Sequence, residues 1–175
     1  MTIQSDDSMP EILKENGIYT HLISDHLHYW EDGGATYHSR YSSWEIIRGQ
    51  EGDHWKGEKK DPQIPPVVKV PQKQQGTGTS GLWRYDWVNR NYIREEEDFP
   101  QTQCFDRGCE FLEKNHDQDN WLLHLETFDP HEPFYVPQKY LDMYPEEYDG
   151  KHFDWPRGAV EEEPEEIAHC RRQYQ

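Results

Sequence analysis

The chain has 175 residues, and 35 acidic against 18 basic side chains give it a formal net charge of −17. This charge disfavours nucleic acid and anionic membrane surfaces as partners, because both are negative, and no apolar run reaches the roughly 18 residues that a membrane span requires. Aliphatic residues are scarce while aromatic residues make up 14%, which suits a loop-rich polar region of a larger domain better than a complete compact domain.

The first predicted elements form part of an α/β unit. Residues 9–17 indicate a short helix, with Pro10 in its first turn and Gly17 at its end. The β-branched and aromatic residues of 18–24 then predict a strand. A helix, a glycine and a strand in this order are typical of α/β proteins.

Residues 31–100 are predicted to be a loop-rich excursion, dominated in its second half by Gly, Pro, Lys and Gln. Within it, residues 41–48 indicate a brief element, because Trp44, Ile47 and Arg48 would share a helical face. A stretch of this length without regular structure also indicates that the domain is incomplete.

Regular patterns return in the second half of the chain. Residues 101–115 predict an amphipathic helix whose apolar stripe is Phe105, Cys109 and Leu112, widened by Phe111. The apolar run 121–128 suits a buried strand of a parallel sheet, although a helix is an open alternative. Two further ranges are predicted to be helical: residues 137–144, and residues 161–175, which begin with an acidic run and end as a helix at 167–172.

Polar side chains gather where the two predicted strands end. His26 and His28 follow the first strand, and His131 follows the second within Asp-Pro-His-Glu-Pro. The carboxyl ends of parallel strands face one side of a sheet, so we expect these two junctions to converge. Imidazoles there could donate hydrogen bonds to an anion, act as acid or base, or ligate a metal.

Each of these candidates has a plainer alternative. His26 and His28 share a face of an extended segment, but two imidazoles do not complete a metal site. The prolines on either side of His131 indicate a fixed presentation that an ordinary surface histidine does not need. Lys56 could hold an anionic substrate or balance nearby carboxylates, and the remaining histidines are interpreted as surface or hydrogen-bonding residues.

Two blocks of the sequence resemble the catalytic domain of sulfatases. Residues 10–20, followed by a strand ending in Ile-Ser-Asp-His, resemble its middle part, and residues 121–144, with the core Phe-Asp-Pro-His-Glu-Pro-Phe, are similar to a second segment. The tail over residues 164–174 resembles the opening of the next helix of that family. The matching blocks cover a third of the chain.

The resemblance implies a metal-dependent hydrolase of the alkaline-phosphatase-like superfamily with an α/β core. Such enzymes attack sulfate esters with a formylglycine made within Cys-x-Pro-x-Arg, and a divalent cation, usually calcium, neutralises the sulfate oxygens. His131 matches the family histidine that contacts the sulfate group. His26 or His28 lies where the family places a Lys-x-His pair, but Asp25 stands near the lysine position. Loss of that lysine would suggest a divergent branch in which Lys56 or a second histidine takes its place.

The chain also departs from the family pattern. Cys104-Phe105-Asp106-Arg107 has Asp where the motif has Pro, and no Ser-Asp-Asn-Gly or Ser-Asp-His-Gly segment follows. We therefore expect residues 1–175 to be an internal segment of a sulfatase-like catalytic domain, a partial core with few parallel strands, flanking helices and the irregular excursion over 31–100.

On this interpretation the nucleophile and most metal ligands lie in the remaining parts of the catalytic domain. The chain alone is expected to hold no divalent cation and to be inactive, whereas the complete enzyme would hydrolyse an anionic sulfate ester. Two alternatives stay open: a phosphodiester or phosphonate ester hydrolase of the same superfamily, and a non-catalytic remnant or binding module.

Overall fold

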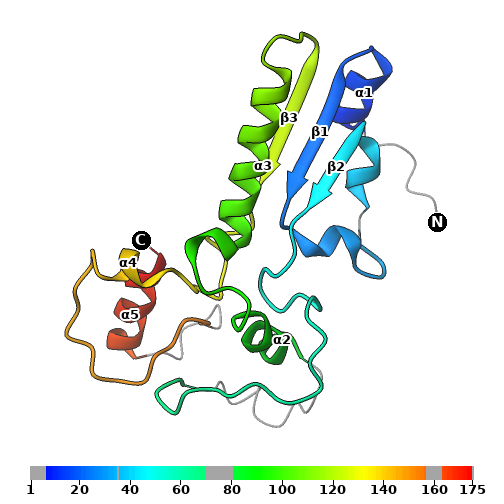
Figure 1. Cartoon of the computed structure of the whole chain (residues 1–175). Coiled ribbons are helices and arrows are strands. Elements are labelled where there is room, and N and C mark those ends of the chain that lie inside the picture. Colours follow the sequence, from blue (N-terminus) through cyan, green and yellow to red (C-terminus); the bar gives the residue numbers. More distant parts are fainter. Residues whose placement is uncertain (1–6, 35, 70–80, 157–162, 175) are drawn as a thin grey trace. The chain divides into compact units, whose positions relative to one another are not determined.

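A computed structural model describes residues 7–34, 36–69, 81–156 and 163–174. Internal contacts divide the chain into two units, the first made of residues 1–50 and 99–128, the second of residues 51–98 and 129–175. The ribbon colours in Figure 1 follow the chain through both units. No helix in the described part of the chain is long and apolar enough to cross a membrane.

The first unit is built around a three-stranded parallel sheet. Its strands are ordered β2-β1-β3, and β1 pairs with both neighbours. The predicted α/β class is therefore confirmed, with few strands, all of them parallel. The elements in chain order are α1 (Met9–Glu15), β1 (Tyr19–Ser24), the 3-10 turns η1 (Leu27–Trp30) and η2 (Tyr37–Arg40), β2 (Ser43–Ile46), α3 (Pro100–Asn115) and β3 (Trp121–Glu126).

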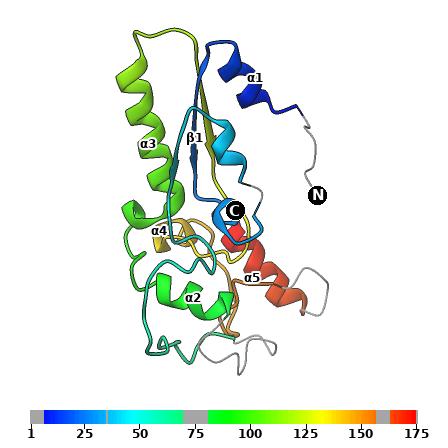
Figure 2. The same ribbon diagram turned by 90° about the vertical axis from the view of Figure 1, so that its right-hand side faces the viewer.

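The central strand β1 is buried because helices cover both faces of the sheet. Leu22 and Ile23 in β1 are fully buried. Figure 2 shows α3 along one face and α1 on the other. Gly17 connects α1 to β1 with a positive φ of 80°, a backbone conformation that glycine adopts at little cost.

Helix α3 packs on the sheet through a different face from the predicted one. Cys104, Gly108 and Phe111 are buried, while Phe105 and Leu112 are exposed by 53% and 45%. The predicted helix is confirmed, and Phe111 of its predicted stripe is buried, but the rest of that stripe (Phe105, Cys109 and Leu112) is exposed. The Leu125 side chain of β3 comes so close that a Cβ on Gly108 would lie 2.6 Å from its Cδ1, so the missing side chain of Gly108 makes room for Leu125.

The brief element expected over residues 41–48 is present, but as strand β2 rather than a helix. Ser43–Ile46 pairs with β1 in parallel register, with His21 opposite Ser43. The shared helical face of Trp44, Ile47 and Arg48 is therefore a wrong prediction. Pairing with a strand that is already buried outweighs a weak local pattern.

The second unit contains little regular structure and a polar interior. Arg84, Asp86, Asn89, Arg90 and Asp154 are all buried. Charged groups at such depth have to be paired. The helices are α2 (Leu82–Asn89), η4 (Glu96–Asp98), α4 (Gln138–Leu141) and α5 (Pro164–Tyr174).

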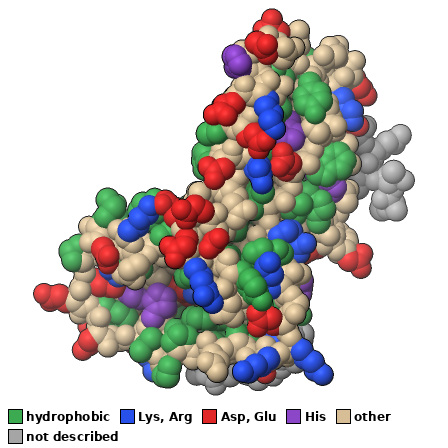
Figure 3. Space-filling model, in the orientation of Figure 1, with side chains coloured by type: hydrophobic (Ala, Val, Ile, Leu, Met, Phe, Trp, Pro, Cys, Tyr) green, Lys and Arg blue, Asp and Glu red, His purple; other side chains and the backbone are tan. Residues whose placement is uncertain are grey.

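Helices α4 and α5 lie within the two ranges predicted as helical, whereas α2 lies inside the predicted excursion where no helix was expected. The sequence 72–78, part of the same excursion, lies outside the described residues. Figure 3 shows acidic and basic side chains interspersed over the drawn face.

Candidate functional site

The residues that follow β1 and β3 meet at the carboxyl end of the sheet. Ser24 and Glu126, the last residues of the two strands, lie opposite each other in the parallel register, and the Ser24 hydroxyl donates a hydrogen bond to Glu126 at 3.1 Å. One step further, the backbone N–H of Phe128 donates to the Asp25 carboxylate at 2.7 Å. The expectation that both strands belong to one parallel sheet is thus confirmed.

Asp25 anchors this junction. Its side chain is fully buried, and the bond from Phe128 joins segments that are 103 residues apart. The resemblance placed Asp25 near a family lysine. In this chain the position holds the two strand ends together.

Glu126 is the centre of the polar groups at this edge. His26 Nδ1 lies 3.4 Å from Glu126 Oε1, and the Tyr29 hydroxyl donates to the same oxygen at 3.0 Å. Burial and the neighbouring carboxylate raise the pKa of Tyr29 well above its ordinary value, so the phenol stays protonated and donates to Glu126. Because Nδ1 of His26 already contacts Glu126, any ligand of His26 has to bind at Nε2.

His28 lies beside His26, although the segment that holds the two is not extended. It belongs to the turn η1, and the two rings are 5.3 Å apart and nearly perpendicular. Both rings also face Phe128, at 5.3 and 6.1 Å. His28 Nδ1 is 2.7 Å from Glu31 Oε2, which fixes the ring of His28.

His131 belongs to the second unit. Its side chain is 48% exposed, and Nδ1 lies 2.7 Å from the backbone carbonyl of Glu132. A carbonyl oxygen only accepts, so this Nδ1 carries a hydrogen, and Nε2 can donate to an anion only when the ring is protonated. Convergence of His131 with His26 and His28 stays a prediction.

Lys56 also belongs to the second unit, where its ammonium lies over two aromatic rings. It is 3.9 Å from the ring centroid of Trp55 and 4.7 Å from that of Tyr92. Such cation–π contacts hold a lysine in place without removing its charge. Its role as a substrate-binding cation stays a prediction.

The comparison with protein families identifies the family to which the chain belongs. The model of the family named Sulfatase matches residues 2–171. The chain belongs to the sulfatase family. No similar protein was found among the curated proteins, and none among the solved structures.

Sulfatases typically use a divalent cation, and the described residues do not fit one. Nowhere in the described ranges do three or more His, Cys, Asp or Glu side chains gather as a metal centre would require. Cys104 of the near-motif is buried in α3. Arg107 lies on the surface of that helix, paired with Glu110 at 3.1 Å.

Sequence reasoning missed Glu126 and Tyr29 as members of this polar cluster at the carboxyl end of the sheet. One signal for Glu126 was available, because it is the charged residue that ends an apolar strand on the side where ligands bind. Tyr29 carried no such signal. Its partner is 97 residues away in the sequence, and only the pairing of β1 with β3 brings the two together.

Proposed function

We propose that this chain contributes part of the active site of a sulfatase that hydrolyses sulfate esters, with His131 acting on the sulfate group and His26, His28 and Lys56 helping to hold the substrate. The observation that carries this proposal is the meeting of the two strand ends, where Asp25 binds Phe128 and His26 packs on the same residue. Ligands of α/β proteins bind beyond such carboxyl ends.

The histidines suit an anionic ester because of how their rings are held. A carboxylate at Nδ1 fixes the orientation of the ring, and Nε2–H of a protonated imidazole held in this way can donate to a sulfate oxygen. His26 and His28 both have this arrangement, with Glu126 and Glu31. Donors of this kind stabilise the charge that develops when sulfur is attacked.

The nucleophile and the cation are proposed to come from other parts of the catalytic domain. The 175 residues contain no Cys-x-Pro-x-Arg, so we propose that a formylglycine and a calcium-type ion are supplied outside this chain. The chain by itself is then expected not to hydrolyse an aryl sulfate such as 4-nitrophenyl sulfate. Turnover that disappears in His131→Ala would contradict that placement of the nucleophile.

Binding of inorganic sulfate tests the histidines directly. In the full chain, sulfate added at constant ionic strength against chloride should shift the imidazole C–H resonances of His26, His28 and His131 together. The matched control is His116, an exposed histidine whose Nδ1 also lies 2.7 Å from a backbone carbonyl, that of Glu113. Its resonances should not move.

The variant His131→Gln shows whether the two junctions share one anion. If they do, its sulfate response is lost at His26 as well, whereas His116→Gln leaves the response unchanged. An unaltered response of His26 in His131→Gln would refute the shared site. Comparing aryl sulfate with bis-aryl phosphate hydrolysis by the complete enzyme then separates sulfatase from phosphodiesterase activity.

A further inference from the structure

The second unit contains a cavity that none of the predicted site residues lines. Its volume is about 530 Å³, within the range of about 300–1,000 Å³ that is usual for small-molecule sites. Its walls come from residues 63–68, from α2 and the two residues after it, from residues 134–141, and from His152 and helix α5. Five separate stretches of one unit therefore line a cavity of ligand size.

The positive charge of the first of the two arginines in its wall is already balanced by two carboxylates. Arg90 Nη1 lies 2.5 Å from Asp154 and Nη2 lies 2.8 Å from Asp86. The guanidinium is also held between aromatic rings, 4.6 Å from the centroid of Trp87 and 4.5 Å from that of Tyr135. Two carboxylates thus face one cation.

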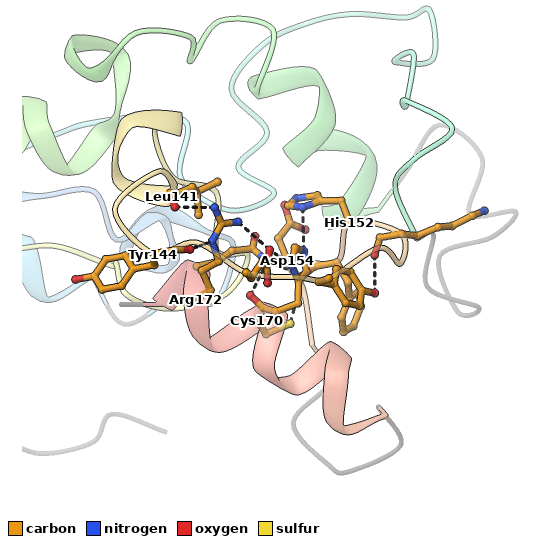
Figure 4. A network of polar contacts seen from close by, with 12 residues as sticks. Leu141, Tyr144, His152, Asp154, Cys170 and Arg172 are labelled. Atoms are coloured by element: carbon orange, nitrogen blue, oxygen red, sulfur yellow. Dashed lines mark hydrogen bonds and ion pairs between the residues drawn. The ribbon is translucent and has the colours of Figure 1, made fainter.

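The second arginine is equally occupied, as Figure 4 shows. Arg172 Nη1 lies 2.8 Å from the Glu146 carboxylate and Nη2 donates to the Leu141 carbonyl at 2.6 Å, while Nε donates to the carbonyl of Tyr144. His152, the remaining basic group of the wall, lies 3.3 Å from Asp154. An anion entering this cavity would meet cations that are already neutralised and carboxylates that repel it.

The uncharged part of the wall combines aromatic rings with amides. Trp87, Phe134 and Tyr135 provide the rings. At the rim, Gln63 and Asn91 are exposed, and neither side-chain amide bonds to another residue within the described ranges. Gln138 donates its N–H to Asp142 at 2.8 Å and keeps its carbonyl oxygen as a further acceptor.

We propose that this cavity binds an uncharged sugar. A sugar ring packs its C–H face against aromatic rings and exchanges hydrogen bonds with amides through its hydroxyls, which both donate and accept. It brings no charge that the paired arginines would have to compensate. The site is separate from the histidines of the proposed sulfate site and does not rest on their role.

Saturation-transfer NMR on the full chain tests the proposal with named probes. These are the methyl glycosides of glucose, galactose, mannose and N-acetylglucosamine, each in neutral and 6-O-sulfated form, at about 1 mM, the range of weak binding. At least one neutral glycoside should receive saturation, and more strongly than its sulfated form. No transfer to any neutral glycoside, or stronger transfer to the sulfated forms, overturns the proposal.

Two matched variants locate the binding. Val67 lines the cavity and Met143 does not, yet both are apolar, exposed by 64% and 66%, and in the same unit. Val67→Arg should reduce the transfer at least fivefold by filling the mouth, while Met143→Arg leaves it unchanged. Equal transfer in both variants means that the sugar binds elsewhere and refutes the assignment, while leaving the sulfate-ester proposal untouched.

Discussion

Neutralising the two carboxyls that flank Arg90 should have opposite effects on stability. Asp86 and Asp154 both contact this guanidinium and all three side chains are buried. Burial raises the pKa of Asp86 to about 7 against the opposing attraction of Arg90. Burial also acts to raise the pKa of Asp154, but Arg90 and His152 outweigh it and hold that pKa well below its ordinary value.

The sign of each contribution follows from these directions. Asp86 binds its proton more tightly in the folded protein than in the unfolded chain, so its contribution to the free energy of unfolding falls as the pH rises from its ordinary pKa of 3.8 to about 7. At about 1.4 kcal/mol per pKa unit, the raised pKa of Asp86 lowers the free energy of unfolding by about 4 kcal/mol above pH 7. The Asp154 carboxylate stabilises the fold above its ordinary pKa, and this contribution is lost only as the pH falls below it.

Asp86→Asn should therefore stabilise the chain at pH 8, by up to about 4 kcal/mol, with a gain that shrinks toward pH 5. Asp154→Asn should destabilise it by about 3 kcal/mol at both pH values, because it breaks a buried ion pair. Urea unfolding followed by tryptophan fluorescence at pH 5 and 8 measures both. Equal destabilisation by the two substitutions at pH 8 would refute the asymmetry.

Four further outcomes are expected. Gly108→Val should lower the free energy of unfolding by about 2 kcal/mol, because its side chain would press on Leu125. In Gly108→Ala a gain in helix propensity of about 1 kcal/mol offsets the smaller clash. Equal melting temperatures for the two variants would contradict the close approach of Leu125. Glu126→Ala should lower the free energy of unfolding in urea by about 2 kcal/mol, because Ser24 and Tyr29 lose their acceptor. Glu126→Gln keeps an acceptor oxygen and should lower it by less than half as much. Tyr29→Phe should cost about 1 kcal/mol, and a neutral result would show that its hydroxyl is not bonded to Glu126. His131→Gln should change stability by less than about 0.5 kcal/mol while removing the sulfate response, so a large loss of stability would make its role structural.

Elements with strong local patterns were predictable from the sequence. The helix before Gly17, the strand after it and strand β3 all form where compositional signals predicted them, although only β1 among them has buried residues. The predicted stripe of α3 failed because it ranked residues by apolar character alone. The buried face includes Gly108, a residue with no side chain to count, while Phe105 and Leu112 stay exposed.

Helix α2 shows the same limit in a stronger form. Three of its five buried residues are polar, namely Arg84, Asp86 and Asn89, so no apolar period marks the helix. Their burial depends on partners far along the chain, such as the Asp61 carboxylate 2.9 Å from Arg84 and the Asp53 carbonyl 2.9 Å from Asn89. A pattern read within a window of neighbouring residues contains none of these contacts.

The same reasoning about distant partners bears on the charge of the proposed sulfate site. Each of its three histidines has a carboxylate nearby: Glu126 for His26, Glu31 for His28, and Glu132 for His131 at 3.6 Å. Even fully protonated, these pairs add no net positive charge to offset a sulfate, whose repulsion by one carboxylate at 4 Å is about 4 kcal/mol in a partly solvated site. The pairs can orient donors, but the positive charge that a sulfate ester requires has to come from other groups. Lys56 is the one cation that this chain is proposed to contribute, so we expect the chain alone to bind sulfate weakly and to leave the ester intact.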